Sequence, residues 1–194
     1  MKKNLLIITG LLFFQIANAQ KSLLFLDEHN KYVYYQVIDL AGISVDSLNK
    51  NAAYFIKTVY PKVKVTSSNT GGIGVSGKFL TYNAVTFVKS ESGEIDYTLN
   101  IECKDAKYRY WVTDFIFKPY KRDRYGAMTA EPGIELPLET ALSKLEKKEF
   151  NGYLDQTGIF CKQLSERLKQ YMIEGSKEKK IEDAPTKKIV TDKW

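Results

Sequence analysis

The residues that could support nucleophilic chemistry are few in this chain. It contains one histidine, His29, and two cysteines, Cys103 and Cys161. A nucleophilic side chain needs an activating base within hydrogen-bond reach, and histidine is the usual one. Because His29 lies in the segment that leads into the first predicted strand, no nucleophile–base pair can be assembled from the sequence. We therefore expect a protein that is not an enzyme, with no catalytic residue and no cofactor.

Carboxylates on one predicted strand raise the question of a metal site. Glu94, Asp96 and Glu102 alternate with apolar residues, and this period of two places them on one face. A hard divalent cation could use such oxygens, but a solvated strand face produces the same pattern, and no histidine or cysteine joins them there. We expect no metal site. For Asp114, on an otherwise apolar face, we expect a buried hydrogen-bonded role rather than a catalytic one.

A glycine-rich segment has the spacing of a phosphate-binding loop. Gly72, Gly77 and Lys78 fit its pattern, but Phe79 stands where the motif has the serine or threonine that contacts Mg²⁺. The segment also leads into a predicted strand, so no helix N-terminus is available for a phosphate. We interpret it as a strand that contains glycines.

The N-terminal residues have the pattern of a bacterial secretory signal. Lys2 and Lys3 precede an apolar run over residues 5–16, and Ala17-Asn18-Ala19 matches a small-x-small cleavage site. The run is too short to cross ~30 Å of hydrocarbon, and no cysteine follows the cleavage site to carry a lipid. We expect residues 1–19 to be removed and the mature protein to be periplasmic or secreted, without stable membrane insertion.

Export leaves two interpretations of the cysteines. An extracytoplasmic compartment permits a disulfide between Cys103 and Cys161. Each cysteine also falls on the apolar side of a predicted strand or helix, where a free thiol packs as a small apolar side chain. The sequence leaves both interpretations open.

Basic and aromatic residues cluster after the last predicted strand. The formal net charge of +6 over 194 residues is a mild excess and does not by itself indicate nucleic acid. The cluster comprises Lys118, Tyr120, Lys121, Arg122, Arg124 and Tyr125. Such a group could bind a polyanion, but Asp123 and Glu131 interrupt it, and DNA is not expected outside the cytoplasm. A solvated loop of mixed charge is one interpretation, and a surface for an unknown envelope protein or glycan is the other.

Hydrophobic periodicity predicts the element order β-α-β-β-β-β-α-α. The strands are expected over residues 31–38, 62–67, 73–89, 94–104 and 107–117, and the helices over 45–60, 138–149 and 153–174. Ser44 is the expected N-cap of the first helix, and Pro61 ends it. Residues 73–89 form one strand, or two with a break near Tyr82-Asn83, and residues 90–93 form a turn.

The remaining segments complete the predicted organisation. Residues 20–30 are a lead-in, residues 118–137 an irregular loop and residues 175–194 a disordered charged tail. The prediction is a single α+β domain over residues 31–174, with a curved antiparallel sheet and helices packed on one face.

The strand at 107–117 is apolar on both faces. Regular alternation places Trp111, Phe115 and Phe117 on one face; the other holds Tyr108, Tyr110, Val112 and Ile116. One face packs on the helices. If the other is uncovered, its aromatic side chains form a partner surface together with the loop that follows. Cover by that loop or by the last helices is the alternative.

Several segments resemble a known family. They are residues 34–38, 42–44, 97–102, 104–110 and 113–115. Over about residues 25–120 the chain resembles the bacterial secreted domain-of-unknown-function 4468 family, whose fold is similar to one repeat of the TATA-binding protein. Ala106 stands where the family favours glycine in a turn, and Tyr54 and Phe55 stand where it tends to have tryptophan. The resemblance implies a fold and carries over no catalytic residues.

Together these observations predict an exported, non-enzymatic module that binds a protein or glycan of the cell envelope. The predicted contact surface is the open sheet face with residues 118–137. A structural or stress-related exported protein without a dedicated ligand is the alternative.

Overall fold

The computed structural model describes residues 23–63, 66–67, 72–85 and 88–175. The predicted signal sequence and the predicted tail beyond Gly175 lie outside these residues. Among the described residues, no helix combines the length and the apolar character needed to cross a membrane.

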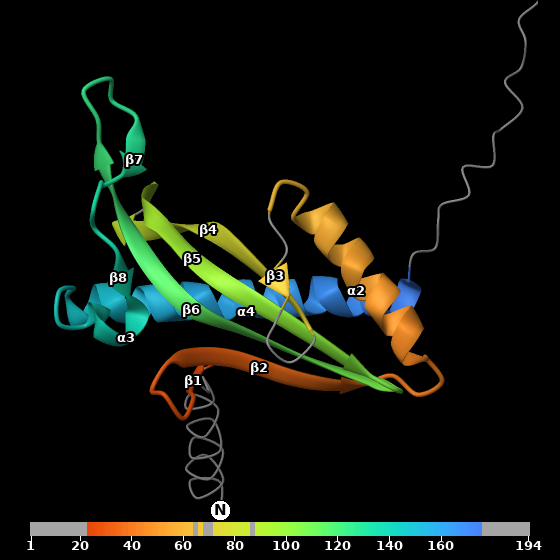
Figure 1. The fold of residues 1–194 in the computed structure, drawn as a ribbon. Coiled ribbons are helices and arrows are strands. Elements are labelled where there is room, and N and C mark those ends of the chain that lie inside the picture. The colour runs from red at the N-terminus through yellow and green to blue at the C-terminus, as the bar shows by residue number, and fades with distance from the viewer. Residues whose placement is uncertain (1–22, 64–65, 68–71, 86–87, 176–194) are drawn as a thin grey trace, which may run out of the picture. The chain divides into compact units, whose positions relative to one another are not determined.

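The described residues form an α+β fold with an open antiparallel sheet (Figure 1), which confirms the predicted class. In chain order the elements are β1 (Phe25–Leu26), β2 (Tyr32–Asp39), α2 (Val45–Val59), β3 (Thr66–Ser67), β4 (Ile73–Val85), β5 (Val88–Lys104), β6 (Lys107–Arg122), β7 (Met128–Ala130), β8 (Leu136–Pro137), α3 (Leu138–Ala141) and α4 (Lys147–Glu174). The strand order is β1-β2-β6-β5-β4-β3, and β7 and β8 both pair with β6.

Helix α2 follows the prediction closely. The Ser44 side chain accepts a hydrogen bond from the Ser47 backbone N–H at 3.3 Å, as an N-cap does. The helix buries the predicted apolar face, which includes Leu48, Ala52 and Phe55. It ends at Val59, two residues before Pro61, because proline cannot continue the hydrogen-bond ladder.

The turn predicted at residues 90–93 is wrong, because these residues lie inside β5. Gly93 serves close packing instead: a Cβ there would lie 2.5 Å from the Lys118 carbonyl oxygen and from a ring carbon of Phe117. Of the two alternatives for residues 73–89, the structure excludes a break near Tyr82-Asn83, because these residues lie inside β4. A glycine that allows a neighbouring strand to pack closely cannot be distinguished, from the local sequence, from a glycine in a turn.

The irregular loop predicted at residues 118–137 is also wrong. Strand β6 continues to Arg122, pairs with β7 over Tyr120–Arg122, and pairs with β8 at Ile116 and Phe117. The lead-in segment likewise contains β1, which pairs with β2. Strands of two or three residues are too short to show a hydrophobic period.

The predicted division between the last helices is displaced. Residues 138–149 contain only the short α3 and the start of α4, and α4 runs through Gly152 without a break. Glycine in a helix interior costs about 1 kcal/mol relative to alanine. Burial of Phe150, Tyr153 and Thr157 on the same helix outweighs that cost.

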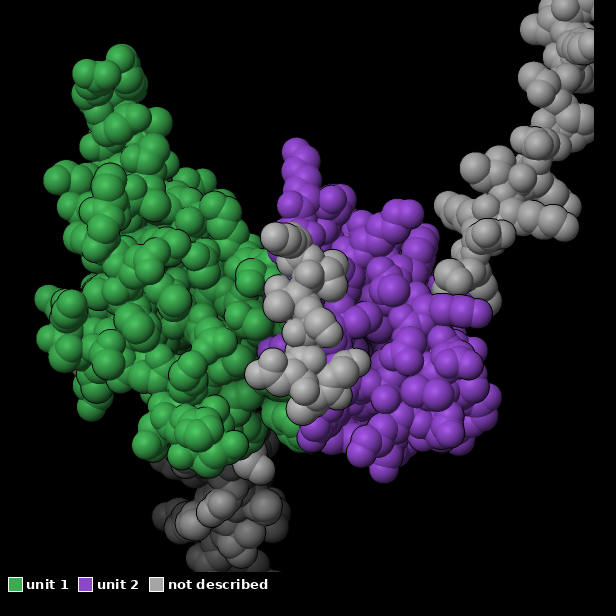
Figure 2. Space-filling model, viewed as in Figure 1, with its two compact units in different colours: residues 1–35, 76–99, 111–163 green, residues 36–75, 100–110, 164–194 purple. Residues whose placement is uncertain are grey.

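The chain divides into two compact units, coloured separately in Figure 2. The first comprises residues 1–35, 76–99 and 111–163. In its core, α4 packs on one face of the strands: Phe160 stacks on Phe79 with ring centroids 4.2 Å apart, and Tyr153 packs on Phe117 at 4.3 Å.

The second unit comprises residues 36–75, 100–110 and 164–194. Phe55 meets the ring of Tyr171 edge-on at 5.4 Å, and the Asn51 side chain donates to the Met172 carbonyl at 3.0 Å. Ala106, at the β5–β6 turn, has a φ of +58°, which explains why glycine suits this position. Backbone hydrogen bonds with Leu40 and Ile43 hold Ala106 in this conformation.

Candidate functional site

A local irregularity in β6 decides which of its side chains face outward. Asp114 has a φ of +56°, a left-handed conformation that interrupts the alternation of the strand. Before it Val112 is buried, and after it Phe115 and Phe117 are buried, at 0% and 1% exposure. The buried positions therefore change from even to odd, as they do at a β-bulge.

This change corrects the predicted partner surface. Phe115 and Phe117 do not share an outward face with Trp111; like Val112, they are buried. Trp111 and Ile116 are half-buried instead. The prediction assumed unbroken alternation, which one residue in the left-handed conformation is enough to reverse.

The face opposite α4 carries cross-strand ion pairs rather than an aromatic patch. Lys118 of β6 lies 2.8 Å from Asp96 of β5 and 2.9 Å from Glu135, just before β8. The hydrogen bonds that the Lys118 ammonium donates to these two carboxylates raise the pKa of Lys118 well above its usual value. The ion pairs of Lys118 thus link β6 to β5 and to the residue just before β8.

Glu94, predicted to be solvated, is only 8% exposed. Its carboxylate accepts a hydrogen bond from the Tyr120 hydroxyl at 3.0 Å and pairs with Lys78 at 2.9 Å. Burial pushes the pKa of Glu94 upward, but the bonds from Lys78 and Tyr120 outweigh it and hold the pKa below its usual value. Burial and the Glu94 carboxylate together raise the pKa of Tyr120 to about 12.

The other residues weighed for phosphate or metal binding have structural contacts. Lys78 of the glycine-rich segment lies in β4, where its ammonium pairs with Glu94. Glu102 accepts from Arg109 through Nε at 2.7 Å and Nη2 at 2.6 Å. Within the described part of the chain, no three histidine, cysteine or acidic side chains are placed to hold a metal ion.

Both cysteines are free thiols in the structure, so no bridge joins them. Cys161 is fully buried, and Cys103 is half-buried rather than fully inward. Burial raises the pKa of the Cys103 thiol to about 11 and raises that of Cys161 further. Neither thiol has the lowered pKa that marks a reactive cysteine.

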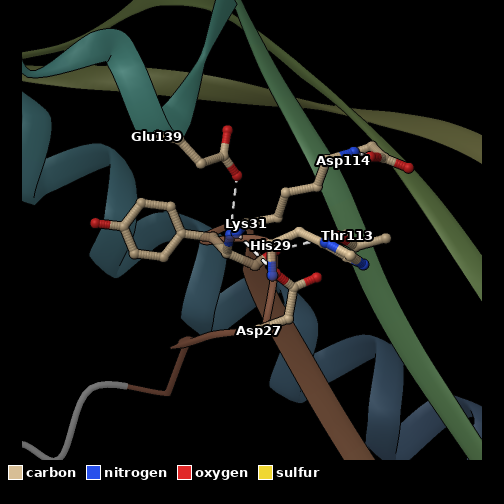
Figure 3. A network of polar contacts seen from close by, with 7 residues as sticks. Asp27, His29, Lys31, Thr113, Asp114 and Glu139 are labelled. Carbon is tan, nitrogen blue, oxygen red and sulfur yellow. Dashed lines mark hydrogen bonds and ion pairs between the residues drawn. The ribbon is translucent and has the colours of Figure 1, made fainter.

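A polar network connects the β1–β2 turn to the bulge at Asp114 (Figure 3). The Lys31 ammonium lies 2.5 Å from the Asp114 carboxylate, and this contact raises the pKa of Lys31. Thr113 donates to the Tyr32 carbonyl, and the Glu139 side chain accepts from the Tyr32 N–H at 2.8 Å. Asp114 is therefore hydrogen-bonded as expected, but its side chain is 40% exposed rather than buried.

Asp27, in the β1–β2 turn, also belongs to this network. Asp27 accepts backbone hydrogen bonds from His29 at 2.9 Å and from Lys31 at 2.8 Å. Because these contacts fix the turn that carries Lys31, the network positions backbone segments. The His29 side chain itself is 76% exposed.

The most exposed of the predicted surface residues lie at the tip of the β6–β7 hairpin, residues 123–127. The Asp123 side chain accepts hydrogen bonds from the backbone N–H groups of Tyr125 at 2.8 Å and Ala127 at 2.9 Å. Tyr125 is 81% exposed, and the Arg124 guanidinium lies 4.9 Å from the centre of its ring. Figure 1 shows that this hairpin extends beyond the neighbouring strands β4 and β5. We refer to residues 123–127 as the hairpin tip.

One charge pair and a backbone hydrogen bond connect the two strands at the base of this hairpin. Lys121 lies 3.6 Å from Glu131 across the hairpin, and the Glu131 backbone N–H donates to the Pro119 carbonyl. Asp123 and Glu131, which looked in the sequence like interruptions of a basic cluster, thus organise it. The sequence contained these residues but not the strand pairing that gives them this role.

Comparison with known proteins finds a family model that matches part of the chain. Residues 34–118 match the family model described as a domain of unknown function, DUF4468, with a TBP-like fold. The match confirms the resemblance recognised in the sequence, and it ends before the hairpin tip.

Two solved structures share the fold of the chain. A TBP-like protein from Parabacteroides distasonis has 16% identity and a TM-score of 0.57, with 75% of this chain and 94% of that one covered. A DUF4468 family protein from Bacteroides ovatus has 11% identity and a TM-score of 0.53, with coverages of 73% and 86%. At these identities the likeness concerns the fold. The comparison with curated proteins finds no match.

Proposed function

We propose that this protein is a non-enzymatic binding module of the bacterial cell envelope, and that it contacts a partner protein through the hairpin tip. The observation that carries the proposal is the presentation of Tyr125, 81% exposed, on a turn that Asp123 orders. Tyrosine and arginine are enriched among the residues that dominate binding energy at interfaces. A backbone turn that is ordered before binding also loses less conformational entropy on association.

The envelope location rests on the N-terminal pattern of the sequence. Lys2 and Lys3, the short apolar run and Ala17-Asn18-Ala19 favour export with cleavage after Ala19. The intact mass of the protein isolated from the periplasm or the medium tests this. A protein that starts at Gln20 supports export, and a chain that retains Met1 in the cytoplasm contradicts it.

The absence of enzymatic activity is part of the proposal. In the first unit the charged side chains of the open face are used in strand-to-strand pairs, such as Lys118 with Asp96 and Lys78 with Glu94. Groups occupied in this way stabilise the sheet and are not presented to a substrate. This distribution favours a scaffold that displays a binding loop.

Site-specific photocrosslinking in the producing cell tests the partner surface. A photoreactive residue replaces Tyr125 in one strain and Tyr35, another exposed tyrosine, in the control strain. We expect a discrete crosslinked product from position 125, and we expect Asp123→Ala to reduce it because the turn loses its two side-chain hydrogen bonds. Equal products from both positions, or none from position 125 in folded protein, would refute a role for the hairpin tip. If the mass of the adduct corresponds to a glycan rather than a protein, the partner is an envelope glycan and the proposed protein partner is wrong.

A further inference from the structure

A cleft of about 410 Å³ lies in the first unit, between the end of β4 and the first turns of α4. Tyr82 and Asn83 contribute one wall, and Glu149 and Gly152 belong to the other. The volume falls in the range of small-molecule sites. The hairpin tip contributes no residue to this cleft, so the two sites are separate.

Two hydrogen bonds between β4 and α4 join the walls of the cleft. The Tyr82 backbone N–H donates to Gln156 Oε1 at 2.9 Å, and Gln156 Nε2 donates back to the Tyr82 carbonyl at 3.0 Å. The side-chain amide thus makes the pair of bonds that a neighbouring strand would make. Because α4 and β4 are joined at this point, the cleft does not need to be organised by a ligand.

Gly152 lines the cleft. It lies inside α4, where glycine costs about 1 kcal/mol relative to alanine. No atom lies within 4 Å of the position that its Cβ would occupy, so packing does not require a glycine here. A side chain at this position therefore starts at the wall of the cleft, and its Cβ meets no other part of the protein.

Two carboxylates and one ammonium line the cleft. Tyr153, 1% exposed, donates its hydroxyl to Glu149 Oε1 at 2.8 Å and lies 3.4 Å from Asn83 Oδ1. Burial and the Glu149 carboxylate raise the pKa of Tyr153, so the hydroxyl stays protonated and fixes the carboxylate. Glu146 adds a second carboxylate, against one ammonium from Lys148.

We propose that this cleft binds an organic cation, an alkylammonium or guanidinium group. Its N–H donors meet the carboxylates of Glu146 and Glu149, and its carbon skeleton lies against the ring of Tyr82, which is 39% exposed. The same chemistry occurs in free amines and in the lysine or arginine side chains of peptides. Neutral polyols lack the charge that the two carboxylates select.

An NMR titration of the ¹⁵N-labelled protein, as isolated from the producing cell, tests the proposal. Putrescine represents a free amine, an N-acetyl-Gly-Lys-Gly amide represents a peptide, and 1,4-butanediol is the neutral control. We expect saturable shifts of the Gly152 and Tyr82 amide signals with a cation and none with butanediol. Binding by putrescine and peptide alike assigns the site to amines in general, and binding by the peptide alone assigns it to a polypeptide ligand.

Two variants identify the groups responsible. Gly152→Leu fills the cleft and is expected to abolish the titration, whereas Gly152→Ala, which adds one methyl group in open space, controls for the change in the helix. Glu146→Gln removes one carboxylate charge and is expected to weaken binding by about tenfold. Absence of shifts with both cations, equal shifts with butanediol, or unchanged binding in Gly152→Leu would each overturn the proposal.

Discussion

The bulge at Asp114 can be tested by substitutions that separate backbone conformation from charge. At a φ of +56°, most residues other than glycine are strained by roughly 1–2 kcal/mol, whereas aspartate and asparagine tolerate this region better. Asp114→Asn keeps this tolerance and removes the charge. Asp114→Val removes the charge and adds a β-branched side chain where it is least suited.

The magnitudes follow from the contacts of Asp114. Its ion pair with Lys31 is exposed on both sides, at 40% and 51%, and such pairs contribute about 0–1 kcal/mol. We therefore expect Asp114→Asn to lower the free energy of unfolding by less than about 1 kcal/mol. Asp114→Gly is expected to be similar, because relief of strain offsets the larger entropy of the unfolded chain. Asp114→Val is expected to lie about 2 kcal/mol below Asp114→Gly.

Urea unfolding followed by tryptophan fluorescence measures these differences, since Trp111 lies in the same strand three residues away. If Asp114→Val and Asp114→Gly have the same stability, the left-handed conformation is not present and the bulge argument fails. If Asp114→Asn is as damaging as Asp114→Val, the ion pair rather than the backbone is what matters. The variant Lys31→Met controls for the pair, and its effect should disappear in the Asp114→Asn background.

Three further predictions follow from the same structure. Because the folded pKa of Glu94 is lowered, its contribution to stability is present above about pH 4.5 and is lost as the pH falls through the lower folded value. Glu94→Gln should therefore cost about 1 kcal/mol at pH 7 and much less at pH 3 in urea unfolding, and a cost independent of pH would contradict this. Gly93→Ala should destabilise the protein by about 2 kcal/mol, because the added Cβ meets the backbone of Lys118. Gly152→Ala should stabilise it by up to about 1 kcal/mol, because its Cβ meets no atom and alanine favours the helix. Equal melting temperatures of the two variants would contradict this difference. Cys103 and Cys161 should react slowly with a thiol reagent at pH 8 when folded and completely when unfolded without reductant; an unreactive unfolded chain would instead show a disulfide.

The parts of the fold that the sequence predicted are those with local causes. Helix α2 has its N-cap at Ser44, its buried face at regular spacing and Pro61 beyond its end, and each signal lies within the segment itself. The alternation from Ile95 to Ile101 in β5 is equally local, since one face is buried and the other is not. Such patterns specify an element without reference to what packs on it.

The errors have causes outside the segments concerned. Gly93 is small because β6 passes close to it, and β7 is a strand because it pairs with Tyr120 and its neighbours. Nothing in residues 90–93 or 128–130 distinguishes these roles from turns or loops. The helix through Gly152 follows the same rule, because burial along α4 outweighs the local preference of one glycine.

The candidate surface shows the same division between local signals and signals from outside the segment. The tip residues Arg124 and Tyr125 were recognised by type, but the order that Asp123 gives them depends on a backbone turn that the sequence does not reveal. Phe115 and Phe117 were assigned to the wrong face because a period of two carries any error forward to the end of the strand. Because Asp114 is in the left-handed conformation, Phe115 and Phe117 are buried instead of facing outward.

The likeness to a nucleic-acid-binding fold needs to be weighed against the charges of this sheet. Binding to a phosphate backbone requires cations that are available to replace counterions. On the open face of the first unit, Lys118 is shared between Asp96 and Glu135, and Lys78 pairs with Glu94. A polyanion would have to displace these carboxylates and leave them next to its own charge. The TBP-like arrangement of strands alone is therefore no argument for a nucleic-acid partner.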